Sequence, residues 1–206
     1  RYTELADQLG ASIKGAYETM TLYYQQGLNM DQAFQVGTET MKMARIAGMD
    51  YAETTNLMTA ALRGFNMEIN DTSAKRINDV YSELAAITAA DTEEIATAMT
   101  KTASIANSAN MEFETTAAFL SQIIETTREA PETAGTALKT IIARFTEVKQ
   151  LYSKGQLTGK DSEGEAININ KIDTALQSVG LSLKGFLRGE EGLDDILLQL
   201  ASKWDT

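Results

Sequence analysis

The sequence predicts an all-α protein, a compact multi-helix bundle of roughly eight or nine helices. Apolar residues recur at intervals of three and four along most of the chain, whereas the period-two alternation of a half-buried strand is almost absent. Residues typical of helix starts and helix ends fall at the limits of these apolar stripes. The expected helices cover residues 2–26, 29–47, 50–65, 71–89, 91–108, 112–128, 131–153, 169–179 and 192–204.

Four of these helices carry an apolar stripe on one face. The first stripe is Thr54, Leu57, Met58, Ala61, Leu62 and Phe65, and the second is Ile95, Ala98, Met99, Thr102, Ile105 and Ala106. The third is Ala134, Leu138, Ile141, Ile142, Phe145 and Val148, and the fourth is Leu193, Ile196, Leu197, Leu200 and Trp204. A one-sided stripe must be covered by another element, so we expect these helices to pack on one another. Most of the methionines lie on or beside the stripes or at helix starts, and we interpret them as core residues.

Helix starts and ends support the same boundaries. Asp50 with Glu53, and Asp91 with Glu94, have the spacing of a capping box, in which two side chains bond to the free backbone groups of the first turn. Gly48 stands where a helix end favours a left-handed residue.

Pro131, the only proline of the chain, is expected to begin the helix over residues 131–153. Its missing N–H is harmless in a first helical turn, where no intrahelical acceptor is available. The small residues Ala134, Gly135 and Ala137 follow, so another element can approach this turn closely. We therefore expect the helix to form a central packing face.

The chain is expected to consist of a main helical domain, residues 1–150, and a loop with a short C-terminal helical segment, residues 151–206, packed on it. Residues 153–168 are rich in Gly, Lys, Ser and acidic residues, which predicts an exposed loop. Residues 181–188 lie between two glycines and are expected to form a short strand or an irregular turn.

A weak repeat pairs Met49-Asp50-Tyr51 with Met111-Glu112-Phe113, and each triplet begins a predicted helix. Two interpretations remain open. The pair could record an internal duplication, or a methionine followed by an acidic residue could simply make a favourable helix start, which we prefer.

Composition excludes several classes of function. The net charge of −11, from 29 acidic and 18 basic residues, disfavours direct binding to nucleic acid, which needs a basic face. The chain has no cysteine and no histidine, so disulfides, thiolate metal sites and histidine-dependent catalysis are excluded. No apolar run reaches the roughly 18 residues of a membrane span. Because the chain begins at Arg1 rather than Met, we expect it to be a segment of a longer protein.

Two patterns in the predicted loop resemble ligand sites without meeting their requirements. Residues 155–160 have glycines like a phosphate-binding loop, but the spacing is one residue short and Asp161 replaces the Ser or Thr that holds magnesium. Asp161, Glu163 and Glu165 alternate like a calcium loop, but Ala166 replaces the required glycine.

The remaining polar patterns have structural explanations. Carboxylates at the start of a helix are stabilised by its dipole, which accounts for Glu93, Glu94, Glu190, Glu191, Asp194 and Asp195. The pairs Ser12-x-Lys14 and Ser182-x-Lys184 lack the glycine-rich surroundings of a Ser–Lys nucleophile. Asn70-Asp71-Thr72 is interpreted as a turn and helix cap. We expect no catalytic, cofactor-binding or metal-ligating residues.

Several segments resemble a known family. They are Ala-Gly-Met at 47–49, Ile-Ala-Asn-Ser-Ala-Asn-Met at 105–111, the stretch from Glu125 to Phe145, and the closing segments Val179-Gly-Leu-Ser-Leu and Leu193-Asp-Asp-Ile-Leu. Together they are similar to the core domain of phage tail tape measure proteins, most densely over residues 85–145.

The resemblance implies a virion structural protein of a phage or prophage that is not an enzyme. Members of this family occupy the lumen of the tail tube, set tail length during assembly in the host cytoplasm, and are released at infection. The implied partners are tail tube and tail assembly proteins, with self-association and host membrane contact also open for the full-length protein. The alternative is a helical module that binds a membrane or a partner without catalysis.

Overall fold

The computed structural model describes residues 2–203, which form eleven helices and one two-stranded hairpin. The helices are α1 (Tyr2–Leu9), α2 (Ile13–Gln25), α3 (Met30–Ala47), α4 (Tyr51–Gly64), α5 (Asp71–Ile87), α6 (Thr92–Ser108), α7 (Phe113–Thr127), α8 (Pro131–Ser153), α9 (Ile169–Ser178), α10 (Lys184–Arg188) and α11 (Leu193–Ala201). The strands are β1 (Thr158–Lys160) and β2 (Ala166–Asn168). The prediction of an all-α multi-helix bundle is confirmed.

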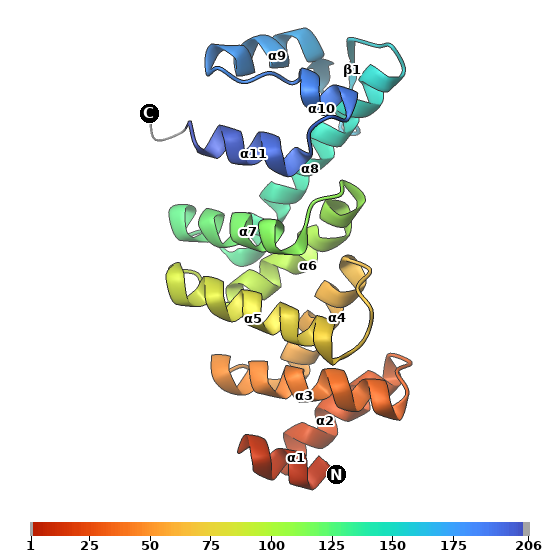
Figure 1. Ribbon diagram of the computed structural model, residues 1–206, viewed down its shortest axis with the longest axis vertical. Helices are drawn as coiled ribbons and strands as arrows, with labels where there is room; N and C mark the ends of the chain where they lie inside the picture. The colour runs from red at the N-terminus through yellow and green to blue at the C-terminus, as the bar shows by residue number, and fades with distance from the viewer. Residues whose placement is uncertain (1, 204–206) are drawn as a thin grey trace.

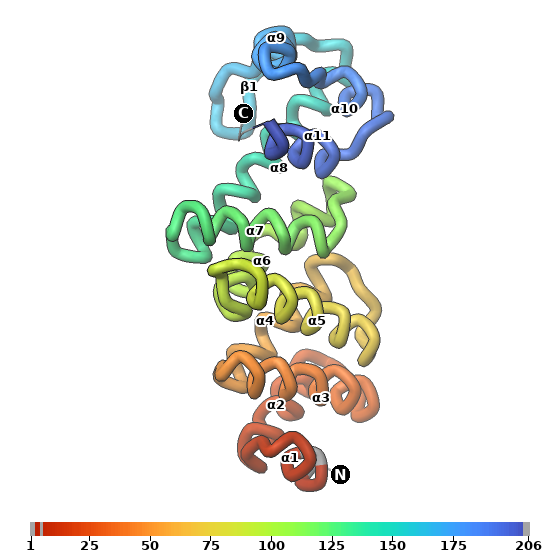
Figure 2. The backbone as a smooth tube through the Cα atoms, turned by 60° about the vertical axis from the view of Figure 1, so that its left-hand side comes forward, coloured from red at the N-terminus to blue at the C-terminus, as the bar shows by residue number. Residues whose placement is uncertain are grey.

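The helices lie in two layers that are stacked along one long axis (Figure 1). Helices α2, α4, α6 and α8 pack in that order and form the even layer, while α3, α5 and α7 form the odd layer beside it. Helix α1 packs on α2 and α3 at one end of the stack. Helices α9, α10 and α11 lie at the other end, beside the later turns of α8 (Figures 1 and 2).

Contacts in this stack are local along the chain. Each extensive helix contact in residues 2–203 joins helices that are one or two positions apart in chain order. The even-layer helices begin at Ile13, Tyr51, Thr92 and Pro131, roughly 40 residues apart, which is the spacing of a helical repeat protein. The accessible surface is 10809 Å², against about 9,400 Å² for a compact monomer of this mass. The bundle is therefore elongated, whereas the sequence led us to expect a compact one.

Most turns between helices share one backbone arrangement, the α5–α6 and α7–α8 turns excepted. A left-handed residue, Gly48 or Asn110 for example, follows the helix, and the next residue donates its N–H back to a carbonyl near the helix end. Met49 donates to the carbonyl oxygen of Ala44 at 2.8 Å, and Met111 donates to that of Ala106 at 3.0 Å. Both methionine side chains are buried, so each turn is fixed by a backbone bond and an apolar contact.

This arrangement explains the weak repeat in the sequence. Met49 and Met111 complete the end of one helix before Asp50 and Glu112 begin the next. The two triplets precede α4, which lies in the even layer, and α7, which lies in the odd layer. The structural repeat of roughly 40 residues instead returns to the same layer. The similarity between the two triplets therefore reflects shared turn chemistry.

Three predicted elements differ from the structure. The helix expected over residues 2–26 is broken into α1 and α2, because Gly10 is left-handed and Ser12 caps α2 by accepting the N–H of Gly15 at 2.9 Å. The loop expected over residues 153–168 contains the antiparallel hairpin of β1 and β2, in which Gly159 pairs with Ile167. Residues 181–188, expected to be a strand or irregular turn, contain the short helix α10.

The predicted stripes form the core. The stripes of α4 and α6 are buried except at their last aromatic or branched positions, Phe65 and Ile105, which are half-buried. In α8, Leu138 and Ile142 are buried, whereas Ile141 remains 38% exposed. Trp204, the last member of the predicted fourth stripe, lies outside the described residues.

Glycine allows α6 and α8 to approach at backbone distance. A Cβ atom on Gly135 of α8 would lie 2.3 Å from the carbonyl oxygen of Ala98 in α6. At the same place, the hydroxyl of the buried Thr102 donates a hydrogen bond of 2.8 Å to the carbonyl oxygen of Gly135. A buried interhelical hydrogen bond thus accompanies a contact that a side chain would prevent.

A glycine also lies at each of the other two even-layer contacts, where it faces a side chain rather than the backbone. A Cβ atom on Gly64 of α4 would lie 2.4 Å from the Cβ of Ala103 in α6. A Cβ atom on Gly15 of α2 would lie 2.4 Å from the ring of Tyr51 in α4. Each pair of adjacent even-layer helices therefore meets at one glycine, and we call these three places the glycine contacts.

Substitution of Gly135 by leucine is expected to lower the free energy of unfolding by more than about 3 kcal/mol, because the new side chain would collide with the backbone of α6. Ala137→Leu is the matched control, since Ala137 is exposed on the same helix and its substitution should change stability by less than about 0.5 kcal/mol. Urea unfolding followed by circular dichroism measures both. Equal midpoints for the two variants would show that α6 and α8 do not pack this closely.

Candidate functional site

The glycine-rich segment at residues 155–160 does not form a phosphate-binding loop. Gly155 ends α8 in a left-handed conformation, and β1 follows as the first strand of the hairpin. A phosphate loop needs a strand before the glycines and a helix directly after them, so that helical N–H groups point at the anion. Here the strand follows the glycine and leads into a hairpin turn, in which the N–H groups of Glu163 and Glu165 are already bonded to Asp161.

Asp161, from the calcium-like pattern, organises that hairpin turn. One carboxylate oxygen accepts the N–H groups of Glu163 and Glu165 at 3.0 and 2.7 Å. The other lies 3.2 Å from a guanidinium nitrogen of Arg144 in α8. Although this second oxygen has no hydrogen bond of good geometry, the nearby guanidinium compensates the charge of a side chain that is only 2% exposed. Asp161 thus fastens the hairpin to α8.

Of the carboxylates expected at helix starts, Glu94 and Asp195 act as caps, whereas Glu190 and Glu191 lie in the turn between α10 and α11. Asp195 accepts the N–H of Gly192 at 2.8 Å at the start of α11. Glu94 accepts the N–H of Asp91 at 2.9 Å, and Asp91 accepts the N–H of Glu94 at 2.8 Å, which completes the capping box of α6. Partial desolvation raises the pKa of Glu93, and the neighbouring carboxylates, including Glu53 of α4, raise it further. Within residues 2–203, no group of three acidic side chains converges as a metal site would require.

The serine–lysine pairs and the Asn70 motif also belong to turns. Ser12 caps α2, as described above. The hydroxyl of Ser182 lies 3.3 Å from a carboxylate oxygen of Asp173, and it accepts the N–H of Lys184 at 3.3 Å. Asn70 accepts the N–H of Ser73 at 2.9 Å and caps α5, in agreement with the interpretation from sequence.

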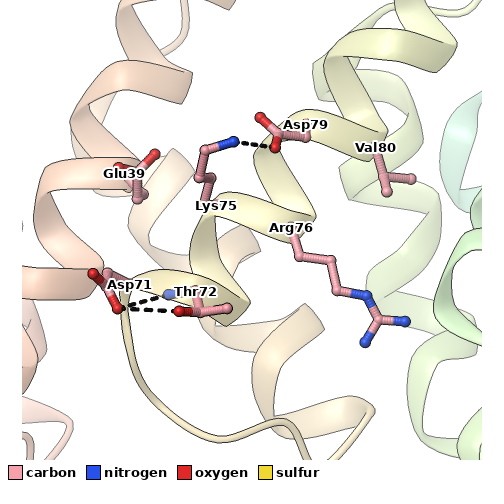
Figure 3. Close-up of a pocket in the computed structure, with 7 residues that line it drawn as sticks. All are labelled: Glu39, Asp71, Thr72, Lys75, Arg76, Asp79 and Val80. Atoms are coloured by element: carbon pink, nitrogen blue, oxygen red, sulfur yellow. Dashed lines mark hydrogen bonds and ion pairs between the residues drawn. The ribbon is translucent and has the colours of Figure 1, made fainter.

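The structure brings together a different set of polar residues, in a groove that follows α5. Its first part lies between α3 and α5, has a volume of about 400 Å³, and is lined by Glu39, Asp71, Thr72, Lys75, Arg76, Asp79 and Val80. Figure 3 shows Lys75 directed to Asp79 on the same helix, while Arg76 extends away from Glu39. Arg76 reaches Glu114 of α7 and forms two bonds of 2.5 and 2.6 Å.

The second part lies on the other side of α5, between α5 and α7, and has a volume of about 370 Å³. Asp79 and Val80 of α5 line both parts. The second part has an apolar floor, Val80, Leu84 and Ala118, and an acidic rim, Asp79, Glu83 and Glu114. We call the two parts together the α5 groove. This groove was not predicted, because its residues come from three helices. In the sequence they show only as the charged outer faces of those helices.

A second groove has no charged residue in its lining. It lies where α7, α8 and α11 meet and has a volume of about 520 Å³. It is lined by Phe119, Gln122, Ile123, Thr126, Leu138, Ile141, Leu197, Leu200 and Ala201. Helix α11 packs less closely on α7 than helix α5 packs on α7. Several leucines of α11 therefore stay partly accessible.

Two tyrosines are buried in the stack, with different surroundings. The hydroxyl of Tyr23 lies 2.5 Å from that of Thr40, between α2 and α3. The ring of Tyr81 packs against Phe113, with ring centres 5.5 Å apart, and its hydroxyl has no hydrogen-bond partner in the described chain. Burial raises the pKa of both phenols well above the usual value of 10.0.

Fold and surface together define an elongated helical repeat protein whose notable surface features are grooves between helices. Comparison with known proteins is consistent with a structural role: residues 3–205 match the family described as phage-related minor tail protein. This chain belongs to that family. It is also 27% identical over 185 residues to the tape measure protein of Pneumococcus phage Dp-1.

That alignment covers 87% of this chain and 16% of the relative, so the chain corresponds to a small part of the relative's length. No solved structure matches the chain. In residues 2–203, no helix has both the length and the apolar character needed to cross a membrane.

Tyr81→Phe is expected to raise the free energy of unfolding by about 1 kcal/mol at neutral pH, because it removes a buried hydroxyl that lacks a partner. Because burial raises the pKa of Tyr81, the unfolded state ionises first, so the parent protein loses stability as pH rises above 10.0. The variant should lose less over that range.

Thermal unfolding between neutral pH and pH values above 10.0 measures both effects. Tyr152→Phe, at a tyrosine that is 37% exposed, is the matched control and should behave like the parent. A Tyr81→Phe variant that is less stable than the parent at neutral pH would show that the hydroxyl makes a bond.

Proposed function

We propose that this chain is a folded segment of a phage tail tape measure protein, which sets tail length, supports assembly of the tail tube and is released at infection. The observation that carries the proposal is the family match over residues 3–205, together with similarity to a tape measure protein over most of the chain. We further propose that the segment occupies the tail tube lumen, contacts tube and assembly proteins, and has no catalytic role. The titratable groups described above serve as caps, ion pairs and turn residues, which supports this last point.

We also propose that residues 1–150 form the main helical domain and that residues 151–206 pack on it. The contact between α10 and α8 supports this packing, since the rings of Phe186 and Phe145 are 5.8 Å apart and nearly perpendicular. Lys149 lies over the same Phe186 ring, with its ammonium nitrogen 4.8 Å from the ring centre.

The architecture determines how much length such a segment can contribute. A single α-helix extends about 1.5 Å per residue, so one repeat of roughly 40 residues would span about 60 Å as a straight helix. In the stack, each repeat adds only one helix-to-helix distance, about 10 Å. Folded and extended states of this segment therefore differ about six-fold in length per repeat.

The stack is also suited to unfolding for passage through a narrow tube. Its helix contacts are local, and no disulfide can form, because the chain has no cysteine. A repeat at the end of such a stack can detach without disturbing distant repeats, so unfolding can proceed in steps.

Deletion of residues 51–91, which hold α4 and α5, is expected to shorten the tail in the phage that encodes this protein. Tail lengths measured by negative-stain electron microscopy distinguish two states: shortening by about 60 Å indicates an extended segment, whereas about 10 Å indicates a folded stack. Duplication of the same residues serves as the matched control and should lengthen the tail by the same amount.

Removal of one complete repeat lets α3 lead directly into α6, so the remaining layers can still pack. Normal tails of unchanged length in both variants would contradict a role of this segment in tail length. Absence of tails in both would indicate that the segment acts in assembly rather than in measuring.

A further inference from the structure

The α5 groove combines the features of a surface that receives another helix. Its part between α5 and α7 has an apolar floor, formed by Val80, Leu84 and Ala118, and lies between these two packed helices. A groove between two packed helices accepts a row of side chains spaced three and four residues apart, as an amphipathic helix presents them.

The charges around this floor are mostly of one sign. The lining of the whole α5 groove contains five carboxylates, on Glu39, Asp71, Asp79, Glu83 and Glu114, and two basic side chains, on Lys75 and Arg76. Between α5 and α7, where the floor is most apolar, the lining has three carboxylates and no basic side chain. Because Asp79 and Glu114 are already paired with Lys75 and Arg76, the charge left for a partner here is that of Glu83, which favours a partner with a basic side chain beside its apolar stripe.

The ion pairs of the groove leave specific acceptors for such a partner. Lys75 is engaged with Asp79, Arg76 is engaged with Glu114, and Lys42 of α3 is engaged with Glu39 at 2.6 Å. Glu83 is exposed at the end of the apolar floor, and no basic residue lines the groove beside it. Its carboxylate is therefore accessible to a lysine or arginine of a bound helix.

We propose that the α5 groove is the docking surface for a cationic amphipathic helix of another protein. The leucine-type side chains of that helix would cover Val80, Leu84 and Ala118, and a basic side chain beside them would pair with Glu83. Apolar contact supplies the affinity, and the acidic rim selects against acidic helices, including helices of this chain, whose net charge is −11. The proposal goes beyond the proposed role in tail length and does not depend on it.

The test uses the 206-residue chain and a fluorescent synthetic helix of about five turns, with leucine at every third or fourth position, lysine beside this stripe and alanine elsewhere. Binding is measured by fluorescence anisotropy. The comparison peptide has the same composition in shuffled order, so that it keeps the charge and loses the stripe. We expect micromolar binding of the striped peptide, weakened by added salt, and at least ten-fold weaker binding of the shuffled one.

Two groove variants separate the apolar and the charged contributions. Ala118→Gln places a polar side chain on the floor, and Glu83→Lys reverses the charge of the rim, and each should weaken binding roughly five-fold or more. Ala137→Gln and Glu129→Lys make the same chemical changes at exposed positions elsewhere in the chain and should leave binding unchanged. All four positions are exposed, so circular dichroism should show the parent fold for each.

Three results would overturn the proposal: no binding of the striped peptide at about 0.5 mM, equal binding of both peptides, or equal effects of the groove and control variants. Any of them would leave the tail-length experiment unaffected, because that experiment reads the contribution of the segment to length rather than its surface. Conversely, unchanged tails in the deletion experiment would not alter the peptide result.

Discussion

The close approach of adjacent even-layer helices is the constraint on which the rest of the structure depends. At the contact of α6 with α8, the backbone of Gly135 lies against the carbonyl of Ala98, and Thr102 closes the contact with a hydrogen bond. Side chains between these helices would separate them and expose the apolar stripes that now form the core. The odd layer rests on the even layer, so its position follows from the same contacts.

A stack built in this way distributes its stability along the chain. Because helices contact near neighbours in the sequence, each repeat is stabilised by its own core and by the interfaces on either side. The C-terminal part is held differently. The hairpin is joined to α8 by the ion pair of Arg144 and Asp161, and α10 is joined to α8 by aromatic contact. The elongated stack also creates the α5 groove, since helices packed side by side leave a furrow that a globular core would cover.

Much of the helical architecture could be predicted from local residues. The stripe over residues 134–148, the proline at the start of α8 and the caps at Asp91 and Asn70 each depend on chemistry within a few residues. The break at Gly10 was missed because a glycine inside an apolar pattern is also tolerated within a helix, and Ser12 alone does not reveal that it caps a new one. The hairpin was missed because its three-residue strands are too short to show alternation.

The arrangement of the helices could not be predicted in the same way. A one-sided stripe indicates that a helix needs a partner, but it does not say whether the partners surround a centre or follow one another along an axis. The α5 groove depends on that arrangement, since Glu39, Asp79 and Glu114 come from three helices. Family resemblance supplied the tail assignment, which no side-chain constellation within the described chain would have suggested.

Small-angle X-ray scattering of the isolated chain tests the central claim, an elongated stack of locally packed repeats, most directly. A compact chain of 206 residues has a radius of gyration of about 17 Å. The stack predicts a clearly larger radius and a distance distribution with a long tail on the side of large separations. A radius near ~17 Å with a symmetric distribution would contradict it, because the helices would then have to surround a common centre.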